Sequence, residues 1–221
     1  VVLLHGLART DASLLVLEET LLAQGYRVVN SDYDSTSGTV ETLAAETLPS
    51  AIRSCGTSPL INFVTHSMGG ILLRVWMAEN DFPQMGRTVM LAPPNQGSEI
   101  VDRMGEVAVF EWINGPSGMQ LGTDGLPTRL GPVWPGVGVI AGTRSLNPLW
   151  SSLLPGPDDG KVSVASTRVA GMDDHIEMSV THTFMMNQPI VIGQILTFLR
   201  NGKFNPDLTL TEAIADIATV D

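Results

Sequence analysis

The sequence predicts an α/β protein whose mostly parallel central sheet carries helices on both faces. Short apolar runs typical of strands alternate with longer amphipathic runs typical of helices over residues 1–202. No internal repeat or low-complexity linker interrupts this alternation. The 221 residues, of which 43% are hydrophobic, can bury the core of one such domain.

The first part of the chain supplies three strand–helix pairs. They are a strand over 1–5 with a helix over 11–25, a strand over 26–33 with a helix over 39–55, and a strand over 60–65 with a helix over 68–80. Leucines at helical spacing indicate the first helix, which Gly25 ends. Pro49 is a candidate break in the second helix.

The second part continues the alternation with longer loops. The expected elements are a strand over 87–94, a helix over 98–114, strands over 137–143 and 175–180, and a helix over 188–202. Residues 115–136 are rich in Gly and Pro and predict an irregular loop. We therefore expect one domain over 1–202, a small cap or acyl-pocket segment over 95–136, and a loosely attached acidic tail over 203–221.

The charge balance excludes one class of partner. The chain has 12 Lys+Arg against 23 Asp+Glu, a net charge of −11 and a pI of about 4.6. A nucleic-acid partner requires a basic face, so we expect none. The acidic excess also disfavours constitutive attraction to anionic lipid, but it leaves transient apolar contact with a lipid surface open.

Cysteine usage and hydropathy say little about the compartment. The single cysteine, Cys55, precludes an internal disulfide, and we interpret it as a structural thiol. No apolar run reaches about 18 residues, so no transmembrane helix is expected. The chain opens directly on a strand, and we expect an N-terminal segment to have been removed. Localisation and oligomeric state stay undetermined.

The stretch THSMGG, residues 65–70, lies where a predicted strand turns into a helix. A serine at such a corner, with small residues around it, is typical of a nucleophile elbow. Gly69 fits this pattern two residues after Ser67, whereas Thr65 replaces the usual first glycine. A serine that only caps the following helix is the alternative.

Two backbone donors can be assigned to an oxyanion hole. A tetrahedral intermediate needs two preorganised N–H groups aimed at its oxygen. In elbow geometry one belongs to the residue after the nucleophile, Met68, and the other to the loop after the first strand, at Leu7. Gly6 lets that loop turn inward, although His-Gly can also be a simple turn.

The base is expected among four histidines. His66 adjoins Ser67, and strand alternation points its side chain away, so we interpret it as a packed neighbour, while His5 belongs to the loop just described. His175 and His182 lie at the two ends of the strand 175–180. Only His182 lies at the carboxyl end, where ligand sites of parallel sheets form, so we choose His182.

The acid is expected between the serine and the histidine in the chain. Asp159 precedes Gly160 on the excursion after strand 137–143, and Asp158 is its rival. Asp124 lies before that strand and fits less well. An Asp-Gly turn without a catalytic role is the alternative interpretation.

These motifs together resemble the α/β-hydrolase superfamily, specifically small bacterial lipases and esterases. HGL, THSMGG, LAPPNQGSE, DDGKVSV and THTF occur in that order and cover about residues 1 to 200. The resemblance implies a minimal core without a large lid domain. It also implies cleavage of a small-molecule or lipid ester through an acyl-enzyme, with Ser67, His182 and Asp159 as triad and no cofactor.

Three other functions stay open at this stage. An acyltransferase would use the same triad with another acceptor, and a non-catalytic binding module would keep only the fold. A metalloenzyme is weakly supported, since no pair of histidines has a spacing of four residues.

Two apolar clusters are candidates for the acyl pocket. Each is equally well explained by ordinary core packing. The first comprises Met104, Val107, Val109, Phe110, Trp112, Ile113 and Met119, and the second comprises Leu146, Leu149, Trp150, Leu153 and Leu154.

Overall fold

The computed structural model has one sheet of six parallel strands, which confirms the predicted fold class. It describes residues 1–104 and 108–219, with side chains 105–113 left undescribed. The strand order is β2-β1-β3-β4-β5-β6, and every neighbouring pair is parallel. The strands are β1 (Val2–Leu4), β2 (Val29–Ser31), β3 (Ile61–His66), β4 (Met85–Leu91), β5 (Val137–Gly142) and β6 (Asp174–Met178).

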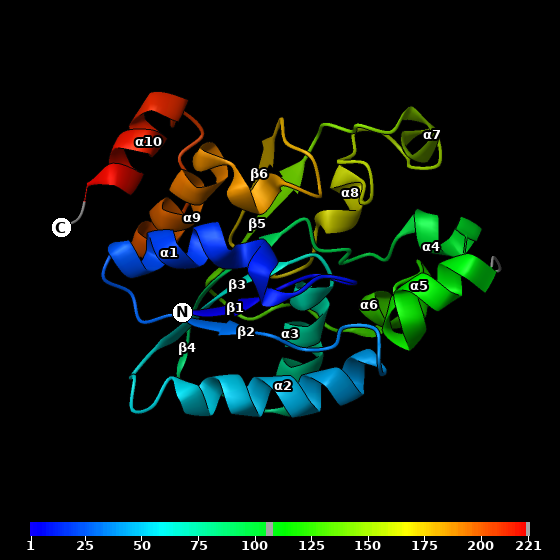
Figure 1. The fold of residues 1–221 in the computed structure, drawn as a ribbon, viewed down its shortest axis with the longest axis horizontal. Coiled ribbons are helices and arrows are strands. Elements are labelled where there is room, and N and C mark those ends of the chain that lie inside the picture. The colour runs from blue at the N-terminus through cyan, green and yellow to red at the C-terminus, as the bar shows by residue number, and fades with distance from the viewer. Residues whose placement is uncertain (105–107, 220–221) are drawn as a thin grey trace.

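Helices cover both faces of this sheet (Figure 1). The longer ones are α1 (Leu15–Ala23), α2 (Val40–Ser54), α3 (Met68–Glu79), α5 (Ala108–Met119), α9 (Pro189–Asn201) and α10 (Leu210–Ala218). The shorter ones are η1 (Asp11–Leu14), α4 (Glu99–Met104), α6 (Leu126–Arg129), α7 (Pro148–Ser151), α8 (Val164–Thr167) and η2 (Met185–Asn187). Among the described residues, no helix is long and apolar enough to cross a membrane.

Strand alternation divides the core into two layers. Leu3 and Val64 pack in one cluster with apolar residues of α1 and α9, whereas Leu4 and Phe63 pack in another with residues of α2 and α3. These strands are buried on both sides, which explains their continuous apolar composition. Gly138 is required in β5 because a Cβ there would lie 2.4 Å from the Phe198 ring.

Two sequence predictions about helices were wrong. Pro49 does not break α2, which runs unbroken through it. Ala45, whose carbonyl loses its partner to the proline, lies on the exposed side of the helix, where water can satisfy it. The helix expected over 98–114 corresponds to α4 and α5, between which lie residues outside the described part of the chain, and α5 extends into the predicted loop with a kink at Gly115.

Residues 210–218 of the C-terminal tail form a docked helix, α10, where the composition predicted a loosely attached segment. Thr209 and Glu212 form a capping box at the start of α10. Ala213 is fully buried where α10 meets α9, and Arg200 pairs with Asp216 at 2.7 Å. The amphipathic pattern within 210–218 indicates a helix, whereas the polar and acidic composition of the tail as a whole does not. The proposed division into domain, cap segment and tail stays a prediction.

Candidate active site

Ser67 lies at a strained turn between β3 and α3. Its φ of 54° and ψ of −123° are unusual for a residue with a side chain. A Cβ at Gly69 would lie 2.5 Å from the Leu4 carbonyl oxygen and 2.7 Å from that of His5, so only glycine fits there. The Ser67 hydroxyl makes no capping bond to α3, which disfavours the helix-cap interpretation.

Ser67, His182 and Asp159 form one hydrogen-bonded chain. Ser67 Oγ lies 3.1 Å from His182 Nε2, and His182 Nδ1 lies 2.7 Å from Asp159 Oδ2. His182 and Asp159 are 4% and 2% exposed, so little water competes for these bonds. The three residues come from segments after β3, β5 and β6, at the carboxyl ends of those strands.

The loop 158–162 fixes the orientation of the Asp159 carboxylate. Its Oδ1 accepts bonds from the backbone N–H groups of Lys161 at 2.9 Å and Val162 at 2.8 Å. These bonds leave Oδ2 directed at His182. A carboxylate only accepts here, so a neutral His182 carries its proton on Nδ1 and presents Nε2 as an acceptor to Ser67.

The rival residues are engaged elsewhere. Asp158 accepts from Ser151 Oγ at 2.8 Å and from the Gly160 N–H at 2.7 Å, whereas Asp124 is exposed. His175 lies within β6, and its Nε2 bonds the Thr167 hydroxyl at 2.9 Å. In this structure only Asp159 contacts His182 through a carboxylate, as far as the described residues extend.

His66 is buried, as expected, but its side chain is directed into the site: it lines the cavity with its ring centroid 4.8 Å from that of His182. Its Nε2 lies 3.0 Å from the His182 carbonyl oxygen, to which it must donate. Loss of hydration and the nearby His182 hold the pKa of His66 well below its usual range. His66 is therefore a neutral support beneath the His182 backbone.

The two expected oxyanion donors lie on either side of Ser67. Met68 begins α3, and Leu7 lies in the loop after β1. A Cβ at Gly6 would come within 3.1 Å of Ser67 Cβ, so this loop passes directly beside the serine. Within the described residues, neither the Leu7 nor the Met68 N–H makes a hydrogen bond, which leaves both open to a ligand.

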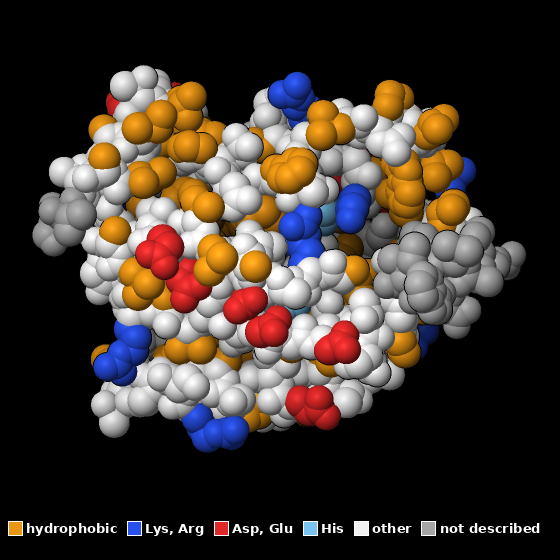
Figure 2. All heavy atoms as spheres, in the orientation of Figure 1, with side chains coloured by type: hydrophobic (Ala, Val, Ile, Leu, Met, Phe, Trp, Pro, Cys, Tyr) orange, Lys and Arg blue, Asp and Glu red, His pale blue; other side chains and the backbone are white. Residues whose placement is uncertain are grey.

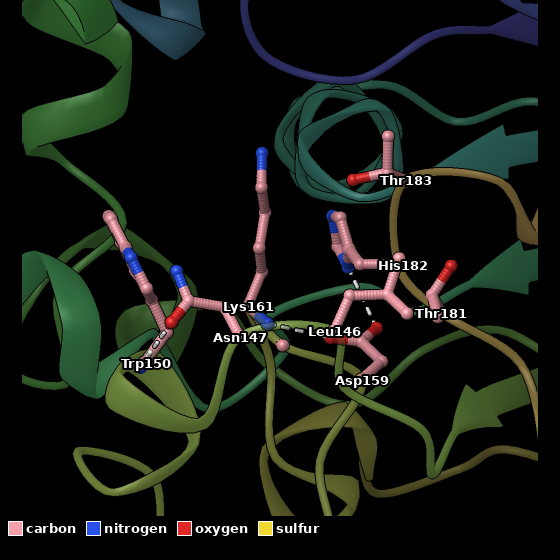
Figure 3. A pocket seen from close by; sticks show the side chains of 9 residues that line it. Leu146, Asn147, Trp150, Asp159, Lys161, Thr181, His182 and Thr183 are labelled. Atoms are coloured by element: carbon pink, nitrogen blue, oxygen red, sulfur yellow. Dashed lines mark hydrogen bonds and ion pairs between the residues drawn. The ribbon is translucent and has the colours of Figure 1, made fainter.

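A cavity of about 530 Å³ opens above Ser67 and His182. Figure 2 shows a hollow on this face where basic side chains gather beside a histidine. A smaller hollow of about 170 Å³ adjoins it, and Figure 3 shows the Asp159–His182 bond at its edge, with Lys161 and Trp150 alongside.

The predicted acyl-pocket residues contribute unevenly to this cavity. Val107, Val109, Phe110, Trp112 and Ile113 fall outside the described side chains. In the same segment, the described residues that line the cavity are Ser98, Ile100, Val101, Asn114 and Leu121, and they do not include Met104 or Met119. In the second cluster Trp150 lines both hollows, Leu154 is buried, and Leu146 and Leu149 are exposed.

Comparison with known proteins identifies the architecture. No family model matches the chain, and no curated protein matches its sequence. Among solved structures, mature lipase BlEst2 from Bacillus licheniformis superposes with a TM-score of 0.72 at 16% identity, covering 90% of both chains. Phospholipase PlaB from Legionella pneumophila in complex with thio-NAD gives 0.68 at 16%, covering 98% of this chain and 61% of that one. Carboxylesterase CesB from Bacillus subtilis gives 0.55 at 14%, covering 91% and 83%.

The chain has the α/β-hydrolase fold.

In this α/β-hydrolase fold, two basic residues of the cavity were not predicted from the sequence. Arg9 and Lys161 both line the cavity that contains Ser67. Their signals were present, since Arg9 follows the His-Gly-Leu loop and Lys161 follows Asp159-Gly160. Neither residue belongs to a catalytic motif, so spacing alone gave them no role. The described residues contain no group of three His, Cys, Asp or Glu side chains able to hold a metal ion.

Proposed function

We propose that this protein is a serine hydrolase that cleaves carboxylic esters through an acyl-enzyme intermediate. The observation that carries the proposal is the chain of hydrogen bonds from Ser67 through His182 to Asp159. A serine hydroxyl is a weak nucleophile until a base removes its proton. His182 Nε2, at 3.1 Å, is suitably placed for that transfer.

In the first half of the reaction, Ser67 attacks the ester carbonyl carbon while His182 takes the hydroxyl proton. The imidazolium that forms is stabilised by the Asp159 carboxylate, which stays ionised. The carbonyl oxygen becomes an oxyanion held by the Leu7 and Met68 N–H groups. Collapse of the tetrahedral intermediate breaks the ester bond, and His182 Nε2 donates its proton to the leaving alcohol.

In the second half, water replaces the alcohol. His182 accepts a proton from that water, which attacks the acyl carbon and forms a second oxyanion in the same pair of N–H groups. Collapse of this intermediate breaks the bond between the acyl carbon and Ser67 Oγ and releases the carboxylic acid, while His182 returns its proton to Ser67 Oγ. The N-terminus of α3 favours the negative charge in both intermediates, because its macrodipole is positive at that end.

Two considerations favour an ester as substrate. The solved structures with this fold include proteins described as a lipase, a phospholipase and a carboxylesterase. The cavity wall is apolar at Ile100, Val101 and Leu121, as an acyl chain requires. We propose that residues 95–136 form this acyl-pocket wall and that the substrate is a small-molecule or lipid ester.

The test uses a fluorophosphonate probe and a short p-nitrophenyl ester. We expect the probe to label Ser67 and the ester to be hydrolysed, with kcat/KM reduced by about 10⁴ or more in Ser67→Ala. The control is Ser13→Ala, a partly exposed serine in η1 that does not line the cavity, which should hydrolyse the ester normally. Hydrolysis by Ser67→Ala at the rate of the unmodified protein would refute the assignment.

A further inference from the structure

Two cationic side chains stand at the mouth of the Ser67 cavity in an otherwise acidic protein. Arg9 and Lys161 both line it, although the chain carries a net charge of −11. The space-filling view shows basic side chains gathered round this hollow, whereas acidic side chains lie elsewhere on the same face (Figure 2). A positive mouth on a negative protein focuses the electrostatic field on the entrance.

Neither cation contacts a carboxylate of the described residues. Among the described residues, no ion pair includes Arg9 or Lys161. Arg9 donates one bond, from Nη2 to the Thr183 carbonyl oxygen at 2.9 Å, which holds the guanidinium at the rim with donors to spare. The Lys161 ammonium has no hydrogen-bond partner within the part of the chain that the structure describes.

The two cations are also close enough to influence each other. Partial loss of hydration, and then the charge of Arg9, lower the pKa of Lys161, whereas Asp159 raises it. Loss of hydration also lowers the pKa of Arg9. Two like charges brought together in this way repel each other, and an anion bound between them would relieve that repulsion.

Both cations flank His182 and therefore the side of the cavity that receives the alcohol. Arg9 is bonded to the residue after His182, and Lys161 lies two residues after Asp159. Figure 3 shows the Lys161 side chain extending between Trp150 and His182. Because His182 must deliver a proton to the leaving oxygen, the groups that surround it also surround the alcohol moiety of the ester.

We propose that the alcohol moiety of the substrate carries an anionic group such as a phosphate, and that Arg9 and Lys161 bind this group together. The inference rests on the proposed ester hydrolysis and specifies its substrate class. An arginine fork and a lysine point charge are the two side chains that proteins use most for phosphate. Both residues act on substrate binding, not on the bonds that form and break.

Such a phosphate ester can be a small soluble metabolite or a lipid. Exposed apolar side chains near the same mouth bear on this choice, since Leu146 is 66% exposed, Leu149 78% and Phe184 52%. Leu146 lines the smaller hollow, and Phe184 follows the Thr183 that Arg9 holds. A lipid aggregate would cover this apolar surface, whereas a soluble ester would not.

The experiment compares two esters that differ only in the anion. We would measure kcat/KM for monomeric dihexanoylglycerol 3-phosphate and for dihexanoylglycerol, and take their ratio. The ratio of kcat/KM for the phosphate ester to that for dihexanoylglycerol should be about ten or more. It should fall about tenfold in each of Arg9→Met and Lys161→Met. Lys161→Arg should retain most of the ratio, and rising salt should lower it.

Arg53→Met is the matched control, because Arg53 is an exposed cation on α2 that takes no part in the cavity lining. It should leave the ratio unchanged. Repeating the assay with dioleoylglycerol phosphate vesicles separates the two sources. Faster turnover in vesicles than in monomers identifies a lipid, and the reverse identifies a soluble ester.

Failure of this inference and failure of the proposed function give different results. A ratio near one, with hydrolysis of both esters that depends on Ser67, overturns the inference and leaves the function intact. If neither ester is hydrolysed, glycerol 3-phosphate and glycerol are titrated into Ser67→Ala by calorimetry. Binding of glycerol 3-phosphate but not of glycerol, weakened when Lys161→Met is added, supports the anion site. Equal binding of the two ligands, or binding of neither, overturns it.

Discussion

The change of Asp159 to asparagine tests the acid assignment through the geometry of a single loop. Asp159 Oδ1 accepts the Lys161 and Val162 N–H groups at 2.9 and 2.8 Å, and Oδ2 accepts His182 Nδ1 at 2.7 Å. An amide in its place has one oxygen only. The two backbone donors require that oxygen at the Oδ1 position, so the NH₂ group must face His182.

The magnitude follows from the cost of turning the amide over. The flipped orientation would lose two hydrogen bonds and aim NH₂ at two N–H groups, which costs about 2–4 kcal/mol. About 1% of the molecules would then hold the productive orientation. In the others the NH₂ donates to Nδ1, so His182 carries its proton on Nε2 and cannot accept one from Ser67. With the weaker stabilisation of the imidazolium, we expect kcat/KM to fall by about 10³ to 10⁴.

The assay is hydrolysis of a short p-nitrophenyl ester by Asp159→Asn and by Asp158→Asn. Asp158 bonds Ser151 and Gly160 and does not touch His182, so its variant should keep activity within about threefold if it remains folded. Thermal unfolding of both variants checks that the fold is retained. If kcat/KM falls by less than tenfold in Asp159→Asn, or by more than tenfold in a folded Asp158→Asn, the reasoning is refuted.

Two further predictions concern stability. Gly69→Ala should lower the free energy of unfolding by about 2–3 kcal/mol, because the new Cβ would collide with the Leu4 and His5 carbonyl oxygens, whereas Gly131→Ala meets nothing within 4 Å and should change little. Equal urea midpoints for the two variants would contradict this. The pKa of His66 is lower in the folded than in the unfolded protein, because burial favours the neutral imidazole. The stability that neutral His66 contributes to the folded state is therefore complete above about pH 6.5 and is lost as the pH falls below that value. Urea unfolding at pH 7.5 and 5.5 should show that the unmodified protein loses about 1 kcal/mol more than His66→Gln, and identical losses would exclude this origin.

Elements with a strong local signal were predicted correctly. The six strands and the alternation with helices follow from apolar periodicity, which depends on neighbours within a few residues. The turn at Ser67 was recognisable for the same reason, since Gly69 must follow it closely in the chain. Helix boundaries in 98–136 were less well predicted, because Gly115 permits a kink that spacing does not reveal.

The tail and the mouth of the cavity required the tertiary structure. The helix over 210–218 is stable against α9 because Ala213 packs closely on Gly193, a contact between segments separated in the chain. Arg9 and Lys161 acquire a common environment only when the loops after β1 and β5 meet at one rim. Neither residue has a motif of its own, so no pattern in the chain could assign it to the site.

The sequence by itself determined the fold class, the strained turn at Ser67 and the choice of His182, because each depends on local spacing and on the common direction of parallel strands. For the acid the sequence favoured Asp159 over its neighbour Asp158, and only the tertiary structure showed which of the two contacts that histidine. Asp158 and Asp159 have almost the same sequence context, yet backbone bonds in their loop direct one carboxylate inward to His182 and the other to Ser151. Ser67 and His182 are 115 positions apart, and their 3.1 Å contact exists because two strands end at the same edge of one sheet.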